Sequence, residues 1–473
     1  MSKSLTVDVV VIGAGAVGEN VAGRLVHKGL SAALVEAELV GGECSYWACM
    51  PSKALLRPGA ALTAAQSVAG SREVVRGPLN AAAVLDRRNS FTSHWDDSGQ
   101  VEWVESTGIT LLRGWAAITG ERRVEVVNDD DGATEVSARH AVVLATGSTA
   151  LAPPIKGLAG TNYWGTREAT SSQDIPASLC VLGAGVAGME LAQAFARLGA
   201  DMTVVARGAV LGNYPRPASA LVEDALDREG VRIISHTATE SVTQAEDGPF
   251  TLRLGSGETL TAEKLLVSTG RKPALDHLGL ESLGLDPGKL VADDTGRVEH
   301  PGNWLYAVGD AAGKVLLTHQ GKYEARTTAD AIAARVAGTL DGDPSPWSSY
   351  ASTANHYAVP QVVFTDPEIA MVGRTLEQAR AEGLNVTETS LEIAVAGSAL
   401  HADQYRGWAQ MVVDEDRRTL VGVTFAGPGV AEMLHSATIA VAGEVPLDRL
   451  WHAVPAYPTI SEVWLRLLEK YEL

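Results

Sequence analysis

The chain has 473 residues, of which 46% are hydrophobic and 20% are charged, a composition typical of a globular protein with a sizeable core. At about 150 residues per domain, this length predicts roughly three domains. The net charge of −19 argues against binding to nucleic acids or to anionic membranes, because both require basic surfaces. The sequence shows no signal peptide and no apolar stretch that would span a membrane, so we expect a protein of the reducing cytoplasm.

The N-terminal residues predict a nucleotide-binding unit. A short apolar and β-branched run, Val7 to Ile12, reads as a buried strand, and a helix is expected over 19–28. A second apolar run, 32–35, ends in Glu36. Glycines between strand and helix permit a tight turn and close approach of a pyrophosphate, and the acid is placed to bind a ribose hydroxyl, so we predict an adenine dinucleotide here. The three glycines are Gly13, Gly15 and Gly18.

Two of the three cysteines, Cys44 and Cys49, follow this unit directly. Five residues along an ideal helix correspond to a rotation of about 140°, so the sulfurs would not face each other on a regular helix. Gly41, Gly42 and Pro51 allow a distorted start. A close pair in a cysteine-poor chain indicates redox or metal chemistry. Because no second cysteine pair or nearby histidine pair exists, metal is the weaker interpretation, and we hypothesise a redox-active pair beside a flavin and no metal site.

The next part of the sequence predicts further elements of the same unit. Residues 54–69 and 80–105 are expected to be mainly helical, and 109–128 and 134–144 to form strands, with a turn at 129–132. Two consecutive prolines then mark a break.

The glycine fingerprint recurs after an apolar run that contains Cys180, which we expect to be a buried small hydrophobe. At the acid position of this second copy stands Ala206, and Arg207 follows. An acid would repel a 2′-phosphate whereas an arginine accommodates it, so we predict a preference for NADPH over NADH; the alternative is that Arg207 is simply solvated. The glycines of the second copy are Gly183, Gly185 and Gly188.

The pattern of expected elements changes after a proline-rich segment at 341–346, and we expect a mixed α+β domain in the C-terminal part. The expected elements are strands within 360–373, 410–414 and 419–425, a helix from 427, and a final helix over 460–470.

Two dinucleotide fingerprints with a cysteine pair after the first suggest that one nucleotide delivers a hydride, the other holds a flavin, and a disulfide receives the electrons. On these motifs the chain resembles the flavoprotein disulfide reductases along nearly its whole length, a family that includes dihydrolipoamide dehydrogenase, glutathione reductase and mercuric reductase. The resemblance implies an α/β fold with two Rossmann-like domains, for FAD and NAD(P), and a C-terminal α+β dimerisation domain. The expected boundaries are 1–150 and 273–345 for the FAD-binding and central parts, 151–272 for the NAD(P)-binding domain and 346–473 for the dimerisation domain.

The resemblance also implies which residues bind the cofactors. Thr146-Gly147 and Gly270-Arg271 match the segments that cross between the FAD and NAD(P) domains, and Asp310 matches the residue that holds the ribityl chain. The full set of expected cofactor-binding residues is Gly13, Gly15, Gly18, Glu36, Gly42, Lys53, Thr146, Gly147, Gly183, Gly185, Gly188, Arg207, Gly270, Arg271 and Asp310.

By the same resemblance, Cys44 would be the interchange thiol that attacks the substrate and Cys49 the thiolate in charge-transfer contact with the flavin. Lys53 would pair with Glu190 near flavin N5. A nearby cation such as Lys53 would lower a cysteine pKa, and Glu190 would keep that lysine from standing unpaired in a partly buried site.

The C-terminus departs from the family pattern. The family usually has a histidine that protonates the outgoing thiol across a homodimer, so the active site is shared between subunits. Here Tyr457 stands at that position, while the family's glutamate is kept as Glu462. A phenol with a pKa near 10 is a poor base near neutrality, and losing a positioned acid/base typically costs on the order of 10²–10⁴ in rate. Five positions earlier, His452 either substitutes for the missing histidine or is simply a histidine near a subunit interface. Mercuric reductase also has a tyrosine here, but this chain lacks that enzyme's C-terminal cysteine pair, so we do not expect a true mercuric reductase.

Two large aromatics, Tyr46 and Trp47, form a second departure between the cysteines. Either they pack into the core or the dimer interface, or they narrow access to Cys44 and offer a stacking face to a flat acceptor such as a quinone.

We therefore predict a homodimeric enzyme that uses FAD and NAD(P)H. A hydride would pass from the nicotinamide to the flavin, then to the Cys44–Cys49 disulfide, and on to a small disulfide. One alternative is a diaphorase-like reductase of quinones, metal ions or oxygen that works directly from reduced flavin. Another is a flavin-binding protein with a structural or regulatory role and little turnover.

Overall fold

The computed structural model of the chain describes residues 3–128, 132–246, 248–300 and 302–472. The first three residues of the turn expected at 129–132 lie outside this described part. None of the described helices is both long and apolar enough to cross a membrane.

The chain divides into two compact units, each built from segments that are far apart in the sequence. The domain boundaries expected from the sequence remain a prediction. Unit 1 consists of Met1–Met50, Asn89–Leu151 and Gly270–Asn355. Unit 2 consists of Pro51–Arg88, Ala152–Thr269 and His356–Leu473.

A seven-stranded sheet forms the centre of unit 1, in the order β3-β2-β1-β6-β5-β4, with β16 also paired to β6. Strand β1 pairs parallel with β2 and β6, β2 pairs parallel with β3, and β16 pairs parallel with β6. Strand β5 pairs antiparallel with both β4 and β6. The strands are β1 (Lys3–Ile12), β2 (Ala32–Glu36), β3 (Thr110–Arg113), β4 (Trp115–Gly120), β5 (Arg123–Asn128), β6 (Gly132–Leu144) and β16 (Leu305–Ala307), beside a separate pair of β7 (Ser148–Ala150) and β15 (Arg271–Pro273).

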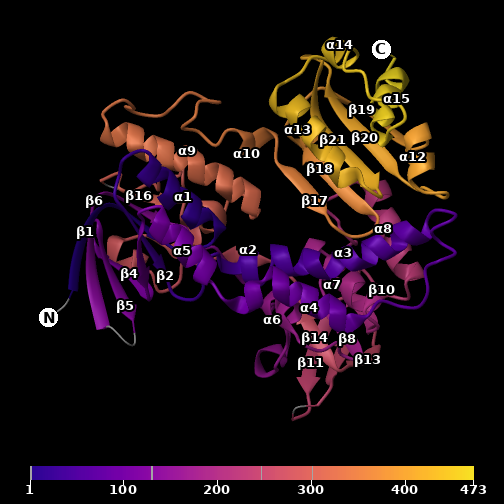
Figure 1. Cartoon of the computed structure of the whole chain (residues 1–473), viewed down its shortest axis with the longest axis horizontal. Helices are drawn as coiled ribbons and strands as arrows, with labels where there is room; N and C mark the ends of the chain where they lie inside the picture. The colour runs from indigo at the N-terminus through magenta and orange to yellow at the C-terminus, as the bar shows by residue number, and fades with distance from the viewer. Residues whose placement is uncertain (1–2, 129–131, 247, 301, 473) are drawn as a thin grey trace. The chain divides into compact units, whose positions relative to one another are not determined.

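The C-terminal half of strand β1 is buried on both faces, as the consecutive apolar residues 9–12 predict. Val10 and Ile12 enter one hydrophobic cluster, and Val9 and Val11 enter another on the opposite face. Helices α1, α5 and α9 contribute to the second cluster, and α1 and α9 run side by side (Figure 1). The helices of unit 1 are α1 (Ala16–His27), α2 (Gly42–Tyr46), α5 (Ser98–Ser106) and α9 (Thr318–Val336), with short 3-10 turns η1 (Ser93–Trp95), η3 (Leu280–Leu283), η4 (Pro287–Lys289) and η5 (Gly309–Ala312).

Unit 2 contains a second parallel sheet, β10-β9-β8-β14, and a three-stranded antiparallel sheet, β11-β12-β13. Cys180 lies in β8 and is 1% exposed, which confirms that it is a buried small hydrophobe. The antiparallel sheet was not predicted from the sequence. The strands are β8 (Ser178–Leu182), β9 (Asp201–Val205), β10 (Arg232–Ile234), β11 (Thr239–Gln244), β12 (Phe250–Leu254), β13 (Thr259–Ala262) and β14 (Lys264–Val267), and the helical elements are η2 (Leu158–Gly160), α6 (Thr166–Ser171), α7 (Val186–Arg197) and α8 (Arg216–Arg228).

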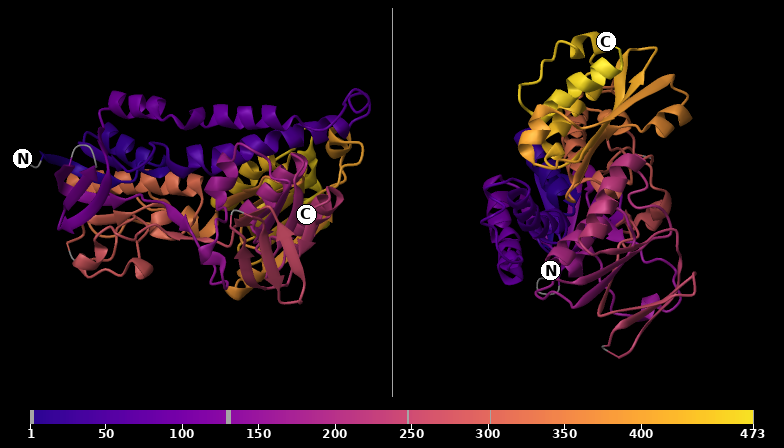
Figure 2. Two further views of the ribbon diagram at one scale, coloured as in Figure 1. Left: turned by 90° about the horizontal axis from the view of Figure 1, so that it is seen from below. Right: turned by 90° about the vertical axis from the view of Figure 1, so that its right-hand side faces the viewer.

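The rest of unit 2 is the expected α+β body, a five-stranded antiparallel sheet in the order β17-β18-β21-β20-β19. Figure 2 shows this sheet and its helices in orange and yellow, in both views. Its elements are β17 (Pro360–Val363), β18 (Glu368–Gly373), α11 (Leu376–Ala381), β19 (Val386–Glu392), α12 (Ala396–His401), β20 (Trp408–Asp414), β21 (Thr419–Gly427), η6 (Val430–Met433), α13 (Leu434–Ala442), α14 (Leu447–Leu450), η7 (Ile460–Glu462) and α15 (Val463–Lys470). Three helices contain unit boundaries or adjoin them: α3 (Cys49–Gln66), α4 (Ala81–Phe91) and α10 (Ala354–Tyr357).

Candidate active site

The first glycine fingerprint has the backbone that the sequence predicts. Gly13 follows β1 with φ +99°, a conformation that favours glycine, and a Cβ atom on Gly18 would overlap with the carbonyl oxygen of Gly13. Glu36 ends β2, and its two carboxylate oxygens accept from the amides of Ala14 (2.8 Å) and Glu38 (2.7 Å). Burial raises the pKa of the Glu36 carboxyl. Each oxygen keeps a lone pair for a further donor such as a hydroxyl.

The loop that carries the cysteines lies directly against this fingerprint. The Gly41 amide donates to the carbonyl of Ala14 at 2.8 Å. Gly42 has φ +60°, and a Cβ atom there would stand only 2.7 Å from the Cα of Gly15. Only glycine permits this approach of the two backbones, which explains why glycines precede Cys44.

The helix breaks between the two cysteines, as their spacing predicts. Cys44 lies in α2, Cys49 opens α3, and Trp47 between them has the non-helical angles φ −136° and ψ −2°. No disulfide joins the two cysteines, and a hydrogen bond with Cys49 together with burial raises the pKa of the Cys44 thiol. The structure thus brings the two reactive sulfurs together at the junction of two short helical segments.

Helix α9 contributes to the same place, which the sequence did not predict. Its first residue, Thr318, has its hydroxyl 3.3 Å from the Cys49 sulfur. One turn later, Lys322 acts on Cys44 through its positive charge, which opposes the rise in the pKa of that thiol. Sequence motifs could not reveal this contact, because Thr318 is 269 residues from Cys49.

The two crossing segments pair with each other within unit 1, where β7 and β15 run antiparallel. Arg271, the first residue of β15, donates from Nε to Ser148 Oγ at 2.7 Å and from Nη2 to Glu43 Oε2 at 2.6 Å. Ser148 Oγ in turn donates to Asp310 Oδ2 at 2.5 Å. Two expected cofactor-binding residues, Arg271 and Asp310, therefore belong to one polar network. Its other members, Glu43 and Ser148, were not singled out from the sequence.

The second fingerprint, in unit 2, repeats the geometry of the first. Gly183 follows β8 with φ +115°, and a Cβ atom on Gly188 would overlap with the Gly183 carbonyl oxygen. Ala206 is buried directly after β9, and the next residue, Arg207, is exposed. An exposed guanidinium at this position is available to an anion.

Lys53 and Glu190 form the ion pair that the resemblance implies, with Nζ 2.7 Å from Oε2. The other carboxylate oxygen of Glu190 accepts from the backbone amide of Phe364 at 2.9 Å. The Lys53 ammonium also lies 4.9 Å from the centre of the Phe364 ring, a cation–π contact. Phe364 therefore contacts both partners, a role that the sequence did not indicate.

At the C-terminus, Tyr457 is 77% exposed and Glu462 is 8% exposed. Glu462 Oε2 accepts from the amide of Gly397 at 3.4 Å. Among the described residues no hydrogen bond joins Tyr457 to Glu462, so within one chain they do not form a proton-relay pair. His452 is also exposed.

Comparison with known proteins assigns the chain to a family. The family model described as pyridine nucleotide-disulphide oxidoreductase matches residues 7–333, and that of the corresponding dimerisation domain matches residues 359–467. The chain belongs to the pyridine nucleotide-disulphide oxidoreductases. It is thus a flavoprotein oxidoreductase that uses FAD and a pyridine nucleotide, and it carries the family's dimerisation domain.

Individual relatives cover almost the whole chain. Mercuric reductase from Acidithiobacillus ferrooxidans is 31% identical over 462 residues, which is 96% of this chain and 80% of that protein. Dihydrolipoyl dehydrogenase from Thermus scotoductus is 31% identical over 474 residues, covering 97% and 95%. The structure of the HOCl-induced flavoprotein disulfide reductase RclA from Escherichia coli, in a Cu(II) complex, has a TM-score of 0.82 at 23% identity and covers 99% of both chains. This last likeness concerns the fold alone.

The residues of unit 1 fit the FAD of this oxidoreductase family. A Cβ atom on Gly15 would meet nothing closer than the Cα of Gly42 at 3.9 Å, so the backbone there is open to a pyrophosphate. Thr146, in the first crossing segment, has a buried hydroxyl oxygen with no hydrogen-bond partner in the described part of the chain. A buried polar atom without a partner is costly, and a bound dinucleotide can supply the missing hydrogen bond.

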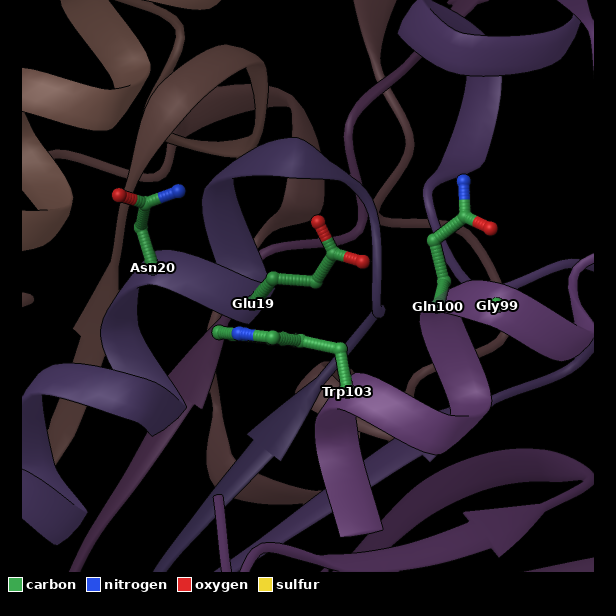
Figure 3. Close-up of a pocket in the computed structure, with 5 residues that line it drawn as sticks. All are labelled: Glu19, Asn20, Gly99, Gln100 and Trp103. Atoms are coloured by element: carbon green, nitrogen blue, oxygen red, sulfur yellow. The ribbon is translucent and has the colours of Figure 1, made fainter. Parts of the chain in front are cut away.

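A pocket of this oxidoreductase lies between α1 and α5 of unit 1 (Figure 3). Glu19 and Asn20 of α1 face Gly99, Gln100 and Trp103 of α5 across it. Glu19 Oε1 is buried and has no hydrogen-bond partner among the described residues, and burial raises the pKa of this carboxyl to about 7. Glu19 is therefore a buried titratable group of unit 1 that the sequence did not identify.

Proposed function

We propose that this oxidoreductase reduces a small disulfide with electrons from NADPH, through the dithiol of Cys44 and Cys49. The observation that supports this most directly is the hydrogen bond between the two thiols at the break between α2 and α3. The same loop lies against the first fingerprint, where the dinucleotide binds.

The first fingerprint with Gly13, Gly15 and Glu36 would hold FAD, and the bound cofactor would supply the transfer of two electrons from the reduced nicotinamide to the Cys44–Cys49 disulfide. The dithiol then reacts by two exchanges. The Cys44 thiolate attacks one sulfur of the acceptor, forms a mixed disulfide and releases one thiolate, which takes up a proton. The Cys49 thiolate attacks the Cys44 sulfur, releases the second acceptor thiolate for protonation, and restores the disulfide.

The raised pKa of Cys44 has a consequence for this exchange. The hydrogen bond with Cys49 and burial favour the protonated form of Cys44, whereas only a thiolate attacks a disulfide. The reaction therefore needs a group that accepts the Cys44 proton and later returns one to the leaving thiolate. We propose that a second subunit places Tyr457 and Glu462 near Cys44, in a homodimer with a shared active site, and that Tyr457, a poor base at neutral pH, serves this proton transfer only weakly.

We propose NADPH as the preferred reductant. Arg207 supports this, because it is exposed two residues after β9, next to the position that meets the 2′ oxygen of the adenosine ribose. Changing Arg207 to Ala should lower kcat/KM for NADPH while leaving kcat/KM for NADH nearly unchanged. A wild-type preference for NADH, or an equal loss with both cofactors, would contradict the assignment.

The experiment that tests the dithiol mechanism uses Cys44→Ser with Cys180→Ala as the matched control. Anaerobic NADPH should bleach the flavin in both variants, because neither change touches the nucleotide sites. Reduction of disulfide acceptors should be lost in Cys44→Ser and kept in Cys180→Ala, since Cys180 is buried in β8. Disulfide turnover that persists in Cys44→Ser would refute the mechanism.

A second candidate is direct reduction of metal ions or quinones. It is supported by Tyr457 in place of a histidine and by the relatives named mercuric reductase. In this case the acceptor takes electrons without thiol exchange. A screen of disulfides, quinones and metal ions with both Cys44→Ser and the wild type separates the two, because direct reduction survives the substitution.

We place either activity in the reducing cytoplasm, where a free dithiol persists.

A further inference from the structure

The residue before the interchange cysteine is an acid that is held by an arginine from a distant segment. Glu43 Oε2 lies 2.6 Å from Arg271 Nη2, although the two residues are 228 positions apart. Their side chains are 35% and 29% exposed. The pair is thus partly shielded from water, and an imbalance of charge there is felt more strongly than at the surface.

The position of Glu43 makes its charge unfavourable for a phosphate ligand. Gly41 and Gly42 pack against Ala14 and Gly15 of the first fingerprint, and Glu43 follows at once. The fingerprint is where the two phosphates of the dinucleotide bind. A carboxylate next to this loop would repel them unless a cation neutralises it.

Arg271 is fixed in a geometry that suits this task. Its Nε donates to Ser148 Oγ at 2.7 Å, and its Nη2 donates to the Ser148 carbonyl at 2.5 Å as well as to Glu43. The planar guanidinium holds these partners at once and stays charged at any pH of interest. Ser148 also donates to Asp310, so the network reaches the residue expected at the ribityl chain.

We propose that Arg271 is a positioning residue that neutralises Glu43, so that the acidic cysteine loop can lie beside the phosphates of bound FAD. Arg271 acts on FAD through Glu43 and not by holding the phosphates itself. The inference does not depend on which acceptor the dithiol reduces.

The test is a double-mutant cycle on the holoenzyme, with the rate of FAD release after dilution followed by flavin fluorescence. Arg271→Gln should release FAD about tenfold faster or more, because Glu43 loses the guanidinium that lies 2.6 Å from its carboxylate. Glu43→Gln alone should release FAD no faster than the wild type. The double variant should return to within about threefold of Glu43→Gln, since no carboxylate remains to repel the phosphates.

A control variant and a measurement at different salt concentrations complete the test. Lys272→Gln is the matched control, because among the described residues Lys272 forms an ion pair only with Asp276, on the surface, where both side chains are about half exposed. Its FAD release should equal that of the wild type. Salt should reduce the defect of Arg271→Gln, because repulsion between partly exposed charges is screened.

Several outcomes would overturn the proposal. If the double variant loses FAD as fast as Arg271→Gln, Arg271 holds the cofactor directly. If Arg271→Gln retains FAD like the wild type, the pair has no part in binding. Should Arg271→Gln fail to fold, Glu43→Gln still decides, because faster release from that variant alone contradicts the inference. None of these measurements uses an acceptor, so failure here is distinct from failure of the proposed function.

Discussion

Lys53 Nζ lies 2.7 Å from Glu190 Oε2, and the two partners differ greatly in their exposure to solvent. The Lys53 side chain is 35% exposed, whereas that of Glu190 is 3% exposed. If Glu190 is neutralised, Lys53 can still be hydrated. If Lys53 is removed, the carboxylate of Glu190 stays buried with only the amide of Phe364 as a partner among those described above.

We therefore expect unequal effects from removing the two charges. Lys53→Met should lower the free energy of unfolding by about 3 kcal/mol, because it leaves a buried uncompensated charge, while Glu190→Gln should cost clearly less. The double variant should recover part of the loss of Lys53→Met. Urea unfolding of the four proteins at pH 7.5 measures these differences. Equal losses for the two single variants would show that exposure does not govern the pair.

Glu19 gives a prediction about pH. Burial raises the pKa of its carboxyl to about 7, against an ordinary value of 4.5, while Lys322 opposes this rise and Glu36 adds to it. Between these two values the folded protein binds the proton more tightly than the unfolded chain. The stability contributed by this group therefore falls as the pH rises through that interval.

Glu19→Gln should remove this slope. The variant should be more stable than the wild type at pH 8, by at most roughly 3 kcal/mol at about 1.4 kcal/mol per pKa unit, and the difference should vanish as the pH falls towards 4.5. Thermal unfolding between pH 5 and 8 measures it. Glu105→Gln on the exposed face of α5 is the control and should show no such trend. Identical pH profiles for Glu19→Gln and the wild type would contradict the assignment.

Asp330 predicts the opposite dependence on pH. It lies on α9, is 6% exposed, and receives two hydrogen bonds from Arg24 of α1, at 2.8 and 2.6 Å, with Lys28 at 3.3 Å. Burial alone would raise the pKa of Asp330, but the hydrogen bonds and charges of Arg24 and Lys28 outweigh it and lower the pKa. The stabilisation is therefore complete above the ordinary value of 3.8 and is lost as the pH falls through the lower value of the folded state.

Asp330→Asn should cost about 2 kcal/mol at neutral pH, because both cations lose their partner between α1 and α9. The difference from the wild type should shrink below about pH 4, as Asp330 of the wild type becomes protonated. Urea unfolding as a function of pH measures this. Arg24→Gln should reproduce part of the loss at pH 7, and a cost that does not change with pH would exclude the ionised carboxylate as its source.

Tyr457 allows a direct test of the missing proton partner. Tyr457→His restores an imidazole, which titrates near neutrality, and should raise disulfide turnover at pH 7 on the order of 10²-fold if proton transfer limits the rate. Tyr457→Phe should leave turnover close to that of the wild type, because a phenol is a poor base at this pH. A strong loss in Tyr457→Phe would instead identify the phenol as the proton donor.

The local features of the nucleotide sites were predictable because they depend on short-range backbone sterics. Gly13 and Gly18 must be glycines for the turn after β1, and the same reasoning applies to Gly183 and Gly188 after β8. The break between Cys44 and Cys49 follows equally from helix geometry, and the structure has it between α2 and α3. The pairing of Lys53 with Glu190, by contrast, was predicted from the family resemblance and not from the residues themselves.

The contacts that tune these sites were decided only by the tertiary structure. Thr318 contacts Cys49 across 269 residues of sequence. Arg271 donates to Glu43 across 228 residues, and the Phe364 amide donates to Glu190 across 174 residues. No periodicity or spacing in a sequence encodes such pairs, because they arise from the packing of separate segments. The sequence by itself therefore determined the family, the two nucleotide fingerprints and the redox pair. The fold decided which charges and hydroxyls surround that pair, because electrostatic interactions depend on distances in space and on burial.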